Sequence, residues 1–168
     1  SAVNKNVVVV LSAGSSVEMP WADRVAAIVH GYLGGQAGAS AMLDVLTGAT
    51  CPSGKLNETY AYSLEDVAST SYYPAIERSS EYREGLYMGY RYFDTAGVKV
   101  RFPFGFGLSY TTFAYSDLTV DGGGVTFTIT NTGECDGAEI AQMYVGHERS
   151  HLFGPKKELK GFVKVFLK

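Results

Sequence analysis

The chain has 168 residues, of which 46% are hydrophobic and 18% charged, and its formal net charge is −3 at neutral pH. That length allows one ordinary domain or two small ones, and the apolar content is enough to build a core. The slightly acidic balance, without a basic stripe, argues against a nucleic acid as partner. The apolar run Val7–Leu11 is too short to cross a bilayer, so we expect no membrane segment.

The start of the chain does not combine a basic region, a long apolar stretch and a cleavage site, so we predict no signal peptide. The sequence therefore decides neither for the cytoplasm nor for secretion.

The first third of the chain alternates strand and helix patterns. Asn6–Ser12 is a continuous β-branched run, typical of a strand buried on both faces of a parallel sheet. Val25–Leu33 is a second apolar stretch. Gln36–Leu46 places apolar residues at helical intervals and is followed by the helix stop Thr47-Gly48. After a turn, Lys55–Ala61 predicts another short strand.

The middle of the chain changes character. From Tyr62 to Ser80 the periodicity lapses, which indicates a long surface excursion or arm. Gly85–Phe93 predicts a short helix ended by a turn at residues 94–97. Residues 80–113 are dense in aromatic side chains and glycines, which supply large buried area and close backbone approach. We interpret this segment as a seam between two packed bodies.

The last third reads as antiparallel β-structure. Short alternating stretches are separated by turns rich in Gly and Asn, namely Ala114–Val120, Val125–Thr130 and Glu139–Val145, followed by Leu159–Leu167. This pattern is typical of a β-sandwich. A sandwich of the fibronectin or immunoglobulin kind has about seven strands, so the pattern here is incomplete.

The loop Ser12–Trp21 is the candidate ligand-binding segment, because ligands of open parallel sheets bind beyond the carboxyl ends of the strands. Glu18 and Trp21 are its two candidate contacts, at the rim of a substrate cleft. A carboxylate accepts hydrogen bonds from sugar hydroxyls, and an indole ring offers a stacking surface. Plain packing is the alternative role for Trp21.

Two other sets of residues on the arm are candidates for a functional role. The carboxylates Glu77, Glu81 and Glu84 lie beside arginines and would have to face a sugar pocket to be catalytic; a paired, solvated surface is favoured. Tyr72 and Tyr73 would stack on a sugar or pack the arm onto its neighbour, and packing is favoured.

Metal chemistry is not expected. His30, His147 and His151 show no spacing suited to a metal or a nucleophilic triad. Cys51 and Cys135 lie far apart in the sequence without metal-ligand spacing, and two free thiols are favoured over a disulfide. We predict neither a metal nor a cofactor.

Several motifs, in one order, closely resemble glycoside hydrolase family 3. Resemblance to the α/β-sandwich domain of that family is carried by Val8–Trp21, Ala27–Gly38, Asp44–Gly48 and Pro52–Leu56. Resemblance to its connector and to the opening strands of a fibronectin type III-like domain is carried by Glu84–Asp94, Phe102–Phe113, Asn131–Gly133 and Lys157–Phe162.

This resemblance implies retaining hydrolysis of a terminal β-linked sugar, most often β-glucoside, through a covalent glycosyl-enzyme intermediate. In the family the nucleophile is an aspartate on a separate (β/α)8 barrel. The acid/base is usually a glutamate on a segment that precedes the strand corresponding to Val7–Leu11. The resemblance thus implies no catalytic residue in this chain, a barrel domain as partner and a carbohydrate as substrate.

The predicted fold class is α/β followed by all-β. We assign residues 1–65 to the C-terminal part of a partial α/β sandwich, residues 66–111 to an aromatic connector and arm, and residues 112–168 to an incomplete fibronectin III-like sandwich. An unpaired sheet edge would favour a homo-oligomer. Domain order and sugar identity stay open.

Two hypotheses follow. The chain is scaffold and cleft wall of a retaining β-glycosidase, or it is a stand-alone carbohydrate-binding or adhesive module. Seam aromatics buried within the chain would favour independence, whereas an exposed apolar patch larger than roughly 600 Å² would favour a partner domain.

Overall fold

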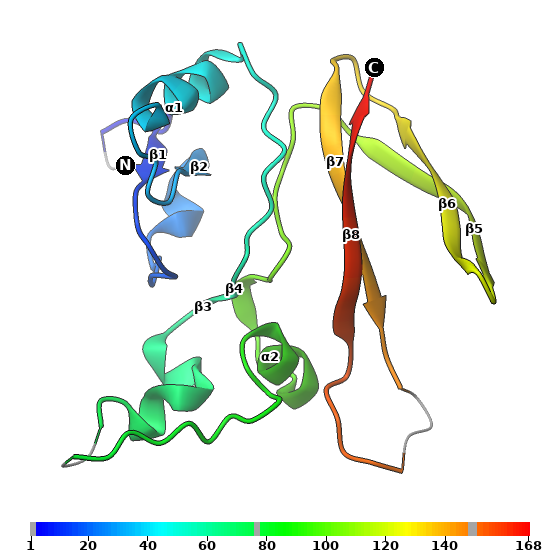
Figure 1. Ribbon diagram of the computed structural model, residues 1–168. Helices are drawn as coiled ribbons and strands as arrows, with labels where there is room; N and C mark the ends of the chain where they lie inside the picture. The colour runs from blue at the N-terminus through cyan, green and yellow to red at the C-terminus, as the bar shows by residue number, and fades with distance from the viewer. Residues whose placement is uncertain (1–2, 76–77, 148–150) are drawn as a thin grey trace.

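The computed structural model describes residues 3–75, 78–147 and 151–168, arranged as two bodies on either side of an extended segment (Figure 1). Its helices and strands, in chain order, are β1 (Val8–Leu11), η1 (Ala22–Arg24), β2 (Ala27–His30), α1 (Gly38–Thr47), β3 (Tyr60–Ala61), η2 (Leu64–Asp66), η3 (Ala68–Tyr72), α2 (Tyr90–Ala96), β4 (Val100–Phe102), β5 (Phe113–Asp121), β6 (Gly124–Asn131), β7 (Gly137–Val145) and β8 (Glu158–Leu167).

The first body contains a parallel pair of strands with a helix beside it, as the sequence predicts. β1 and β2 pair in parallel, with Val8 opposite Ala27 and Leu11 opposite His30. α1 ends at Gly48, whose left-handed φ of 78° is the conformation that favours glycine at a helix C-terminus. The predicted burial of β1 on both faces is not found, because Val8 and Val10 are 46% and 49% exposed.

Two predicted elements are displaced. The strand expected over Lys55–Ala61 is reduced to β3, which pairs antiparallel with β4 instead of joining the parallel sheet. The helix expected over Gly85–Phe93 forms at Tyr90–Ala96. Gly85 and Gly89 have φ of 56° and 54°, which lie outside the right-handed helical region, so the helix begins only after the second glycine.

The arm contains more local structure than its lapsed periodicity suggests. Two short 3-10 helices, η2 and η3, follow β3 (Figure 1). Ser63 and Asp66 form a reciprocal cap at the start of η2, where the Asp66 carboxylate accepts the backbone N–H of Ser63 at 3.1 Å. Side-chain capping of this kind stabilises a turn without any apolar repeat.

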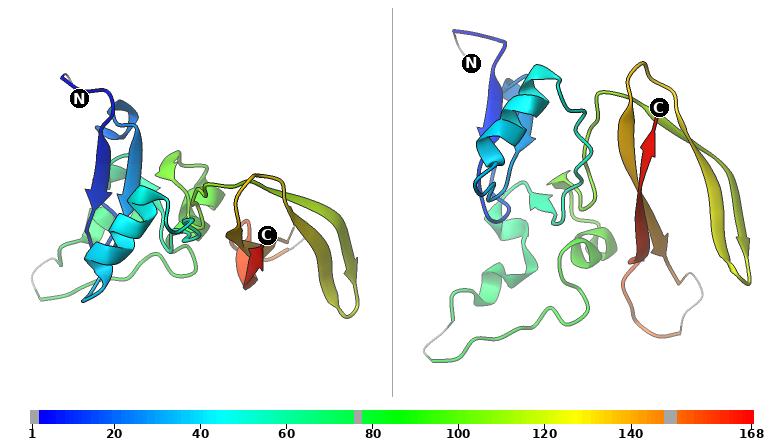
Figure 2. Two further views of the ribbon diagram at one scale, coloured as in Figure 1. Left: turned by 90° about the horizontal axis from the view of Figure 1, so that it is seen from above. Right: turned by 45° about the horizontal axis from the view of Figure 1, so that its top comes forward.

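The second body consists of two antiparallel hairpins. β5 pairs with β6 and β7 pairs with β8, and each pair forms its own two-stranded sheet among the described residues. Viewed from above, the β5–β6 hairpin extends away from β7 and β8 (Figure 2). The four predicted strands are therefore present, with boundaries shifted by a few residues.

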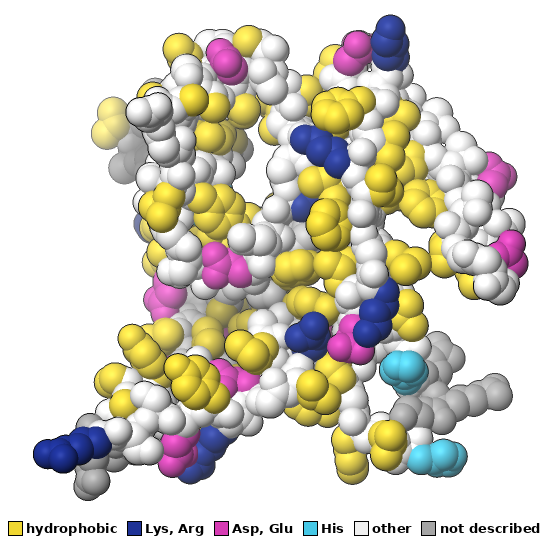
Figure 3. All heavy atoms as spheres, in the orientation of Figure 1, with side chains coloured by type: hydrophobic (Ala, Val, Ile, Leu, Met, Phe, Trp, Pro, Cys, Tyr) yellow, Lys and Arg dark blue, Asp and Glu magenta, His cyan; other side chains and the backbone are white. Residues whose placement is uncertain are grey.

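The chain buries little of its own surface. Its accessible surface is 12168 Å², whereas a folded monomer of this mass exposes about 8,100 Å². The described hydrophobic residues that are buried are Met19, Tyr60, Phe93, Ala138 and Ala141. Apolar side chains lie open along β7 and β8 and over the first body (Figure 3). The chain thus exposes about 4,000 Å² more than a self-contained monomer of its mass.

Candidate functional site

A polar and aromatic cluster lies at the carboxyl ends of β1 and β2. The hydroxyl of Ser12 donates to the carbonyl of Tyr32 at 3.0 Å. The His30 ring stacks on Tyr32 with centroids 3.8 Å apart, and its Nδ1 lies 3.2 Å from the carbonyl oxygen of Leu11. The backbone N–H of Tyr32 also points at Nδ1, at the longer distance of 3.4 Å. We assign the ring proton to Nδ1, because the nearer Leu11 carbonyl can only accept. Nε2 then accepts from the Tyr60 hydroxyl at 2.5 Å.

Tyr60 is the most deeply buried residue of this cluster, with 1% of its surface exposed. Desolvation raises the pKa of its hydroxyl, and the neighbouring Tyr32 and Glu58 raise it further. The hydroxyl therefore stays protonated and available as the donor to His30. The sequence alone leaves His30 isolated, since no periodic signal links it to a residue thirty positions later.

The two predicted rim residues lie on the loop that follows β1. Oε1 of Glu18 accepts the backbone N–H of Leu64 at 2.5 Å, which ties this loop to η2. Trp21 is half-buried, and its carbonyl accepts the N–H of Arg24 at 2.9 Å in the turn of η1. Met19, on the same loop, is buried, with 4% of its surface exposed. One oxygen of the exposed Glu18 is thus committed to the protein's own backbone.

One of the acidic residues of the arm, Glu81, is ion-paired at the surface. Glu81 and Arg83 make an ion pair in which both side chains are about half exposed. The Arg83 guanidinium also lies 5.8 Å from the centre of the Tyr72 ring, whereas Tyr73 is 78% exposed. Glu77 lies outside the described residues. This arrangement agrees with the paired-surface interpretation of the cluster.

The seam segment, defined here as residues 102–111, runs against the first body. The N–H of Leu56 donates to Phe106 O at 2.8 Å, and Gly105 N–H donates back to Leu56 O at 2.7 Å. At Gly107 a Cβ atom would lie 2.1 Å from the carbonyl oxygen of Gly54. The glycine at position 107 is therefore required by close backbone approach.

The other edge of the seam segment contacts β7. Nε2 of Gln142 donates to Gly105 O at 3.0 Å, and Tyr144 donates its hydroxyl to Gln142 Oε1 at 2.7 Å. Lys55 and Glu139 pair across the seam at 3.1 Å, with only 15% and 13% of their side chains exposed. The aromatic and glycine-rich region is thus a seam between two bodies, as the sequence predicts.

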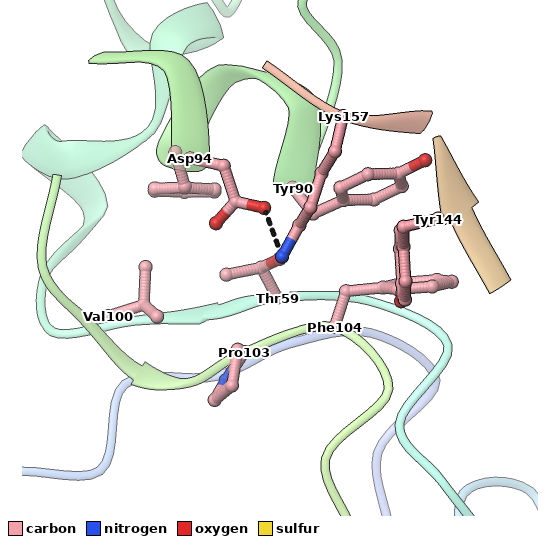
Figure 4. Close-up of a pocket in the computed structure, with 9 residues that line it drawn as sticks. Thr59, Tyr90, Asp94, Val100, Pro103, Phe104, Tyr144 and Lys157 are labelled. Atoms are coloured by element: carbon pink, nitrogen blue, oxygen red, sulfur yellow. Dashed lines mark ion pairs between the residues drawn. The ribbon is translucent and has the colours of Figure 1, made fainter. Parts of the chain in front are cut away.

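A small cavity lies where α2, the seam segment and the two strands β7 and β8 meet (Figure 4). The rings of Tyr90 and Phe104 stack with centroids 4.8 Å apart, and the Tyr90 hydroxyl oxygen accepts the backbone N–H of Leu159 at 2.7 Å. Across the cavity, Lys157 pairs with Asp94 at 3.1 Å. The cavity has a volume of about 30 Å³, which is enough for a water molecule but not for a sugar ring.

An open groove of about 380 Å³ lies next to this cavity, between the seam segment and β7. Its polar side chains bond to one another: Tyr115 donates to Glu139 at 3.2 Å, and Glu139 in turn pairs with Lys55. Groups already satisfied in this way are typical of packing between two bodies rather than of a ligand site.

Within the described ranges, no group of three or more His, Cys, Asp or Glu side chains gathers closely enough to hold a metal ion. In the same residues no helix combines the length and apolar character needed to traverse a membrane. Cys51 and Cys135, distant in sequence, are both free thiols and lie together at the seam.

Known proteins of similar sequence and fold are named as enzymes that cleave glycosidic bonds. The family model of the glycosyl hydrolase family 3 C-terminal domain matches residues 1–110. The chain is 49% identical to thermostable β-glucosidase B of Acetivibrio thermocellus, over 98% of this chain and 23% of that protein. It is 44% identical to an exo-α-(1→6)-L-arabinopyranosidase of Bifidobacterium breve, over 100% of this chain and 23% of that one.

The fold agrees with a crystal structure of a Bifidobacterium adolescentis family 3 β-glucosidase, with a TM-score of 0.95 and 47% identity over 99% of this chain and 26% of that structure. The matched proteins are glycoside hydrolases. The chain belongs to glycoside hydrolase family 3, and it spans about a quarter of the length of the relatives that it matches.

Proposed function

We propose that these residues are part of a retaining β-glycosidase, in the first instance a β-glucosidase that hydrolyses terminal β-linked sugars, and that they serve as its scaffold and cleft wall. The observation that carries this proposal is the open apolar surface. An accessible area of 12168 Å², about 1.5 times that of a self-contained monomer of this mass, calls for a further body to cover it. A (β/α)8 barrel is the partner that we propose.

The reacting carboxyl groups belong to other parts of the full-length enzyme in this proposal. Retaining hydrolysis needs two carboxyl groups about 5 Å apart, one with a raised pKa. Here the Arg101 side chain lowers the pKa of Asp23, and Lys160 lowers that of Glu158. Glu139 is held by Lys55. Downward shifts and internal ion pairs suit structural carboxylates, not a general acid.

We further propose the division of the chain into three parts. Residues 1–65 are the end of the α/β sandwich, residues 66–111 are the connector and arm, and residues 112–168 are the opening strands of a fibronectin type III-like domain. The end of the family match at residue 110 and the change from parallel to antiparallel pairing support this division. Antiparallel hairpins are the building unit of such a sandwich.

Sugar selection is assigned to residues outside this chain. The identities to a β-glucosidase and to an arabinopyranosidase are 49% and 44%, so the segment is nearly equally similar to enzymes named for different substrates. The loop bearing Glu18 and Trp21 is proposed as cleft rim, because it follows β1 at the carboxyl edge of the parallel pair. Its contribution would be to shape the entrance.

The test uses the full-length protein on nitrophenyl β-glucoside and α-L-arabinopyranoside, with NMR detection of the anomer released first. We expect hydrolysis with retained configuration, and a KM that rises several-fold in Trp21→Ala. Tyr82→Ala, at an 88% exposed position on the arm, is the matched control and should leave KM unchanged. Sugar binding without hydrolysis would favour the stand-alone module, and turnover by residues 1–168 alone would contradict the assignment of both carboxyl groups elsewhere.

A further inference from the structure

Two thiols from distant parts of the sequence meet beside the seam. Cys51 follows α1 in the first body, and Cys135 lies in the turn between β6 and β7. The two thiols lie close enough for each to shift the pKa of the other. A Cβ atom built at Gly137, two residues after Cys135, would lie 3.4 Å from the Cys51 sulfur. The sulfur of the first body therefore reaches the turn of the second.

Side chains of the seam segment and of β6 hold both cysteines in place. Cys51 Sγ lies 3.2 Å from the hydroxyl of Ser109. On the other side, Thr111 donates its hydroxyl to Asn131 Oδ1 at 2.6 Å, and Asn131 donates Nδ2 to the carbonyl of Cys135 at 2.9 Å. Ser109 and Thr111 both belong to the seam segment, and Thr111 is only 6% exposed. The seam segment therefore holds Cys51 through Ser109, and Cys135 through Thr111 and Asn131.

The surroundings make the two thiols unequal. Desolvation raises the pKa of Cys51, but hydrogen bonds from Ser109, from the backbone of residues 110 and 111 and from Cys135 outweigh it and leave the pKa below its usual value. Desolvation and the proximity of Cys51 raise the pKa of the exposed Cys135. A thiol with a lowered pKa beside one with a raised pKa is the arrangement found in dithiol redox pairs.

We propose that Cys51 and Cys135 are a redox pair that closes into a reversible disulfide across the seam, by exchange with a small-molecule disulfide. The Cys51 thiolate attacks one sulfur of that disulfide, which releases one thiolate and leaves a mixed disulfide on Cys51. Cys135 then loses its proton to solvent and attacks Cys51 Sγ, and the second thiolate departs. Two protein thiols are oxidised and one external disulfide is reduced to two thiols.

The bond would join the two bodies covalently. It closes a loop of 84 residues (135 − 51 = 84) that contains the arm, α2 and the seam segment. Such a closure restricts the unfolded chain and prevents separation of the bodies. The inference rests on the contacts of the two thiols and does not depend on the proposed glycosidase function.

The experiment incubates the reduced full-length protein with excess oxidised glutathione, alkylates the remaining thiols and maps the peptides without reduction. We expect one linked peptide pair containing residues 51 and 135, about 2 Da lighter than the sum of its reduced parts, which dithiothreitol separates. Ser109→Ala should slow alkylation of Cys51 by iodoacetamide several-fold in the reduced protein, because the hydroxyl that stabilises the thiolate is gone.

The single variants Cys51→Ser and Cys135→Ser provide the matched controls, since each should stop at a glutathione adduct on the remaining cysteine. Circular dichroism of all variants checks that the fold is kept. Recovery of the wild type with both cysteines alkylated, or with glutathione on each, would overturn the proposal. A folded wild-type protein therefore gives either the linked peptide pair, which supports the proposal, or unlinked cysteines, which contradict it.

Discussion

The seam segment and the outer face of β8 are built from similar residues and end in opposite surroundings. Phe102 and Phe104 of the seam are half-buried, and the Phe104 ring stacks on Tyr90 with centroids 4.8 Å apart. Phe162 and Phe166 of β8 are 73% and 78% exposed. Aromatic content therefore does not decide burial in this chain. Burial depends on a second surface to pack against. The seam has such a surface on each side, whereas the outer face of β8 has none among the described residues.

Gly107→Ala should break the seam most severely. The added methyl would lie 2.1 Å from Gly54 O, a backbone atom fixed by the antiparallel contact, so either the seam segment or residues 54–56 must move. We expect a loss of about 3 to 4 kcal/mol, at the upper end for single substitutions. Denaturant unfolding of the full-length enzyme, monitored at this region by hydrogen exchange, measures it.

Gly54→Ala is the matched control, because a Cβ atom there meets nothing within 4 Å. Its effect should stay within about 0.5 kcal/mol. Equal losses for the two alanine variants would show that glycine flexibility, and not close packing at the seam, matters here.

Phe162→Ala tests whether the outer face is covered in the full-length enzyme. If another body packs on β8, removing the ring should cost about 3 kcal/mol, although Phe162 is 73% exposed in this chain. Phe153→Ala removes the same ring from a loop position that is 100% exposed, and should cost less than about 0.5 kcal/mol. Thermal unfolding of the two variants compares them directly, and equal small effects would argue against a covering domain.

Glu139→Ala removes one partner of the ion pair that crosses the seam. Lys55 would be left 15% exposed without its carboxylate, although it keeps a hydrogen bond to Gly107 O at 2.9 Å. We expect a loss of about 2 kcal/mol, which is less than for a fully buried pair. Glu81→Ala, in the exposed pair with Arg83, should change stability by at most about 0.5 kcal/mol. Similar values for both would place Glu139 at the surface.

Much of the fold follows from local pattern. The β-branched run of β1, the helical spacing of α1 and the glycine that ends it are local signals, and each element forms where it is predicted. The second helix is displaced because two glycines, 85 and 89, both take positive φ, so spacing alone could not decide after which of them the helix starts.

The contacts of the candidate site could not be predicted from the sequence. The hydrogen bond from Tyr60 to His30 and the meeting of Cys51 with Cys135 join residues 30 and 84 positions apart. No periodicity records such pairs, since they are set by how the bodies dock. The continuous valine run of β1 predicts burial of the strand on two faces. In this chain Val10 is 49% exposed, so the described residues do not supply the cover that the pattern predicts.

The smallest expected effect is a loss of folding stability at alkaline pH. It distinguishes a tyrosine at the seam from a tyrosine on the open surface. Tyr115 donates to Glu139 at 3.2 Å, and desolvation together with that carboxylate raises the pKa of Tyr115 to about 12. Because the folded pKa lies above the unfolded value of about 10, the unfolded chain loses its proton first as the pH rises. The contribution to stability is therefore complete below pH 10 and is lost between about pH 10 and 12.

Tyr115 is 52% exposed, so screening by solvent should reduce this contribution to below about 1 kcal/mol. Tyr115→Phe should accordingly flatten the decline of the guanidinium unfolding midpoint between about pH 10 and 11, relative to the wild type. Tyr82→Phe, at an 88% exposed position, should follow the wild-type curve. Each variant lacks one tyrosine hydroxyl, so the difference between the two variant curves isolates the hydroxyl of Tyr115. Parallel curves for wild type and Tyr115→Phe would mean that Glu139 interacts with Lys55 alone.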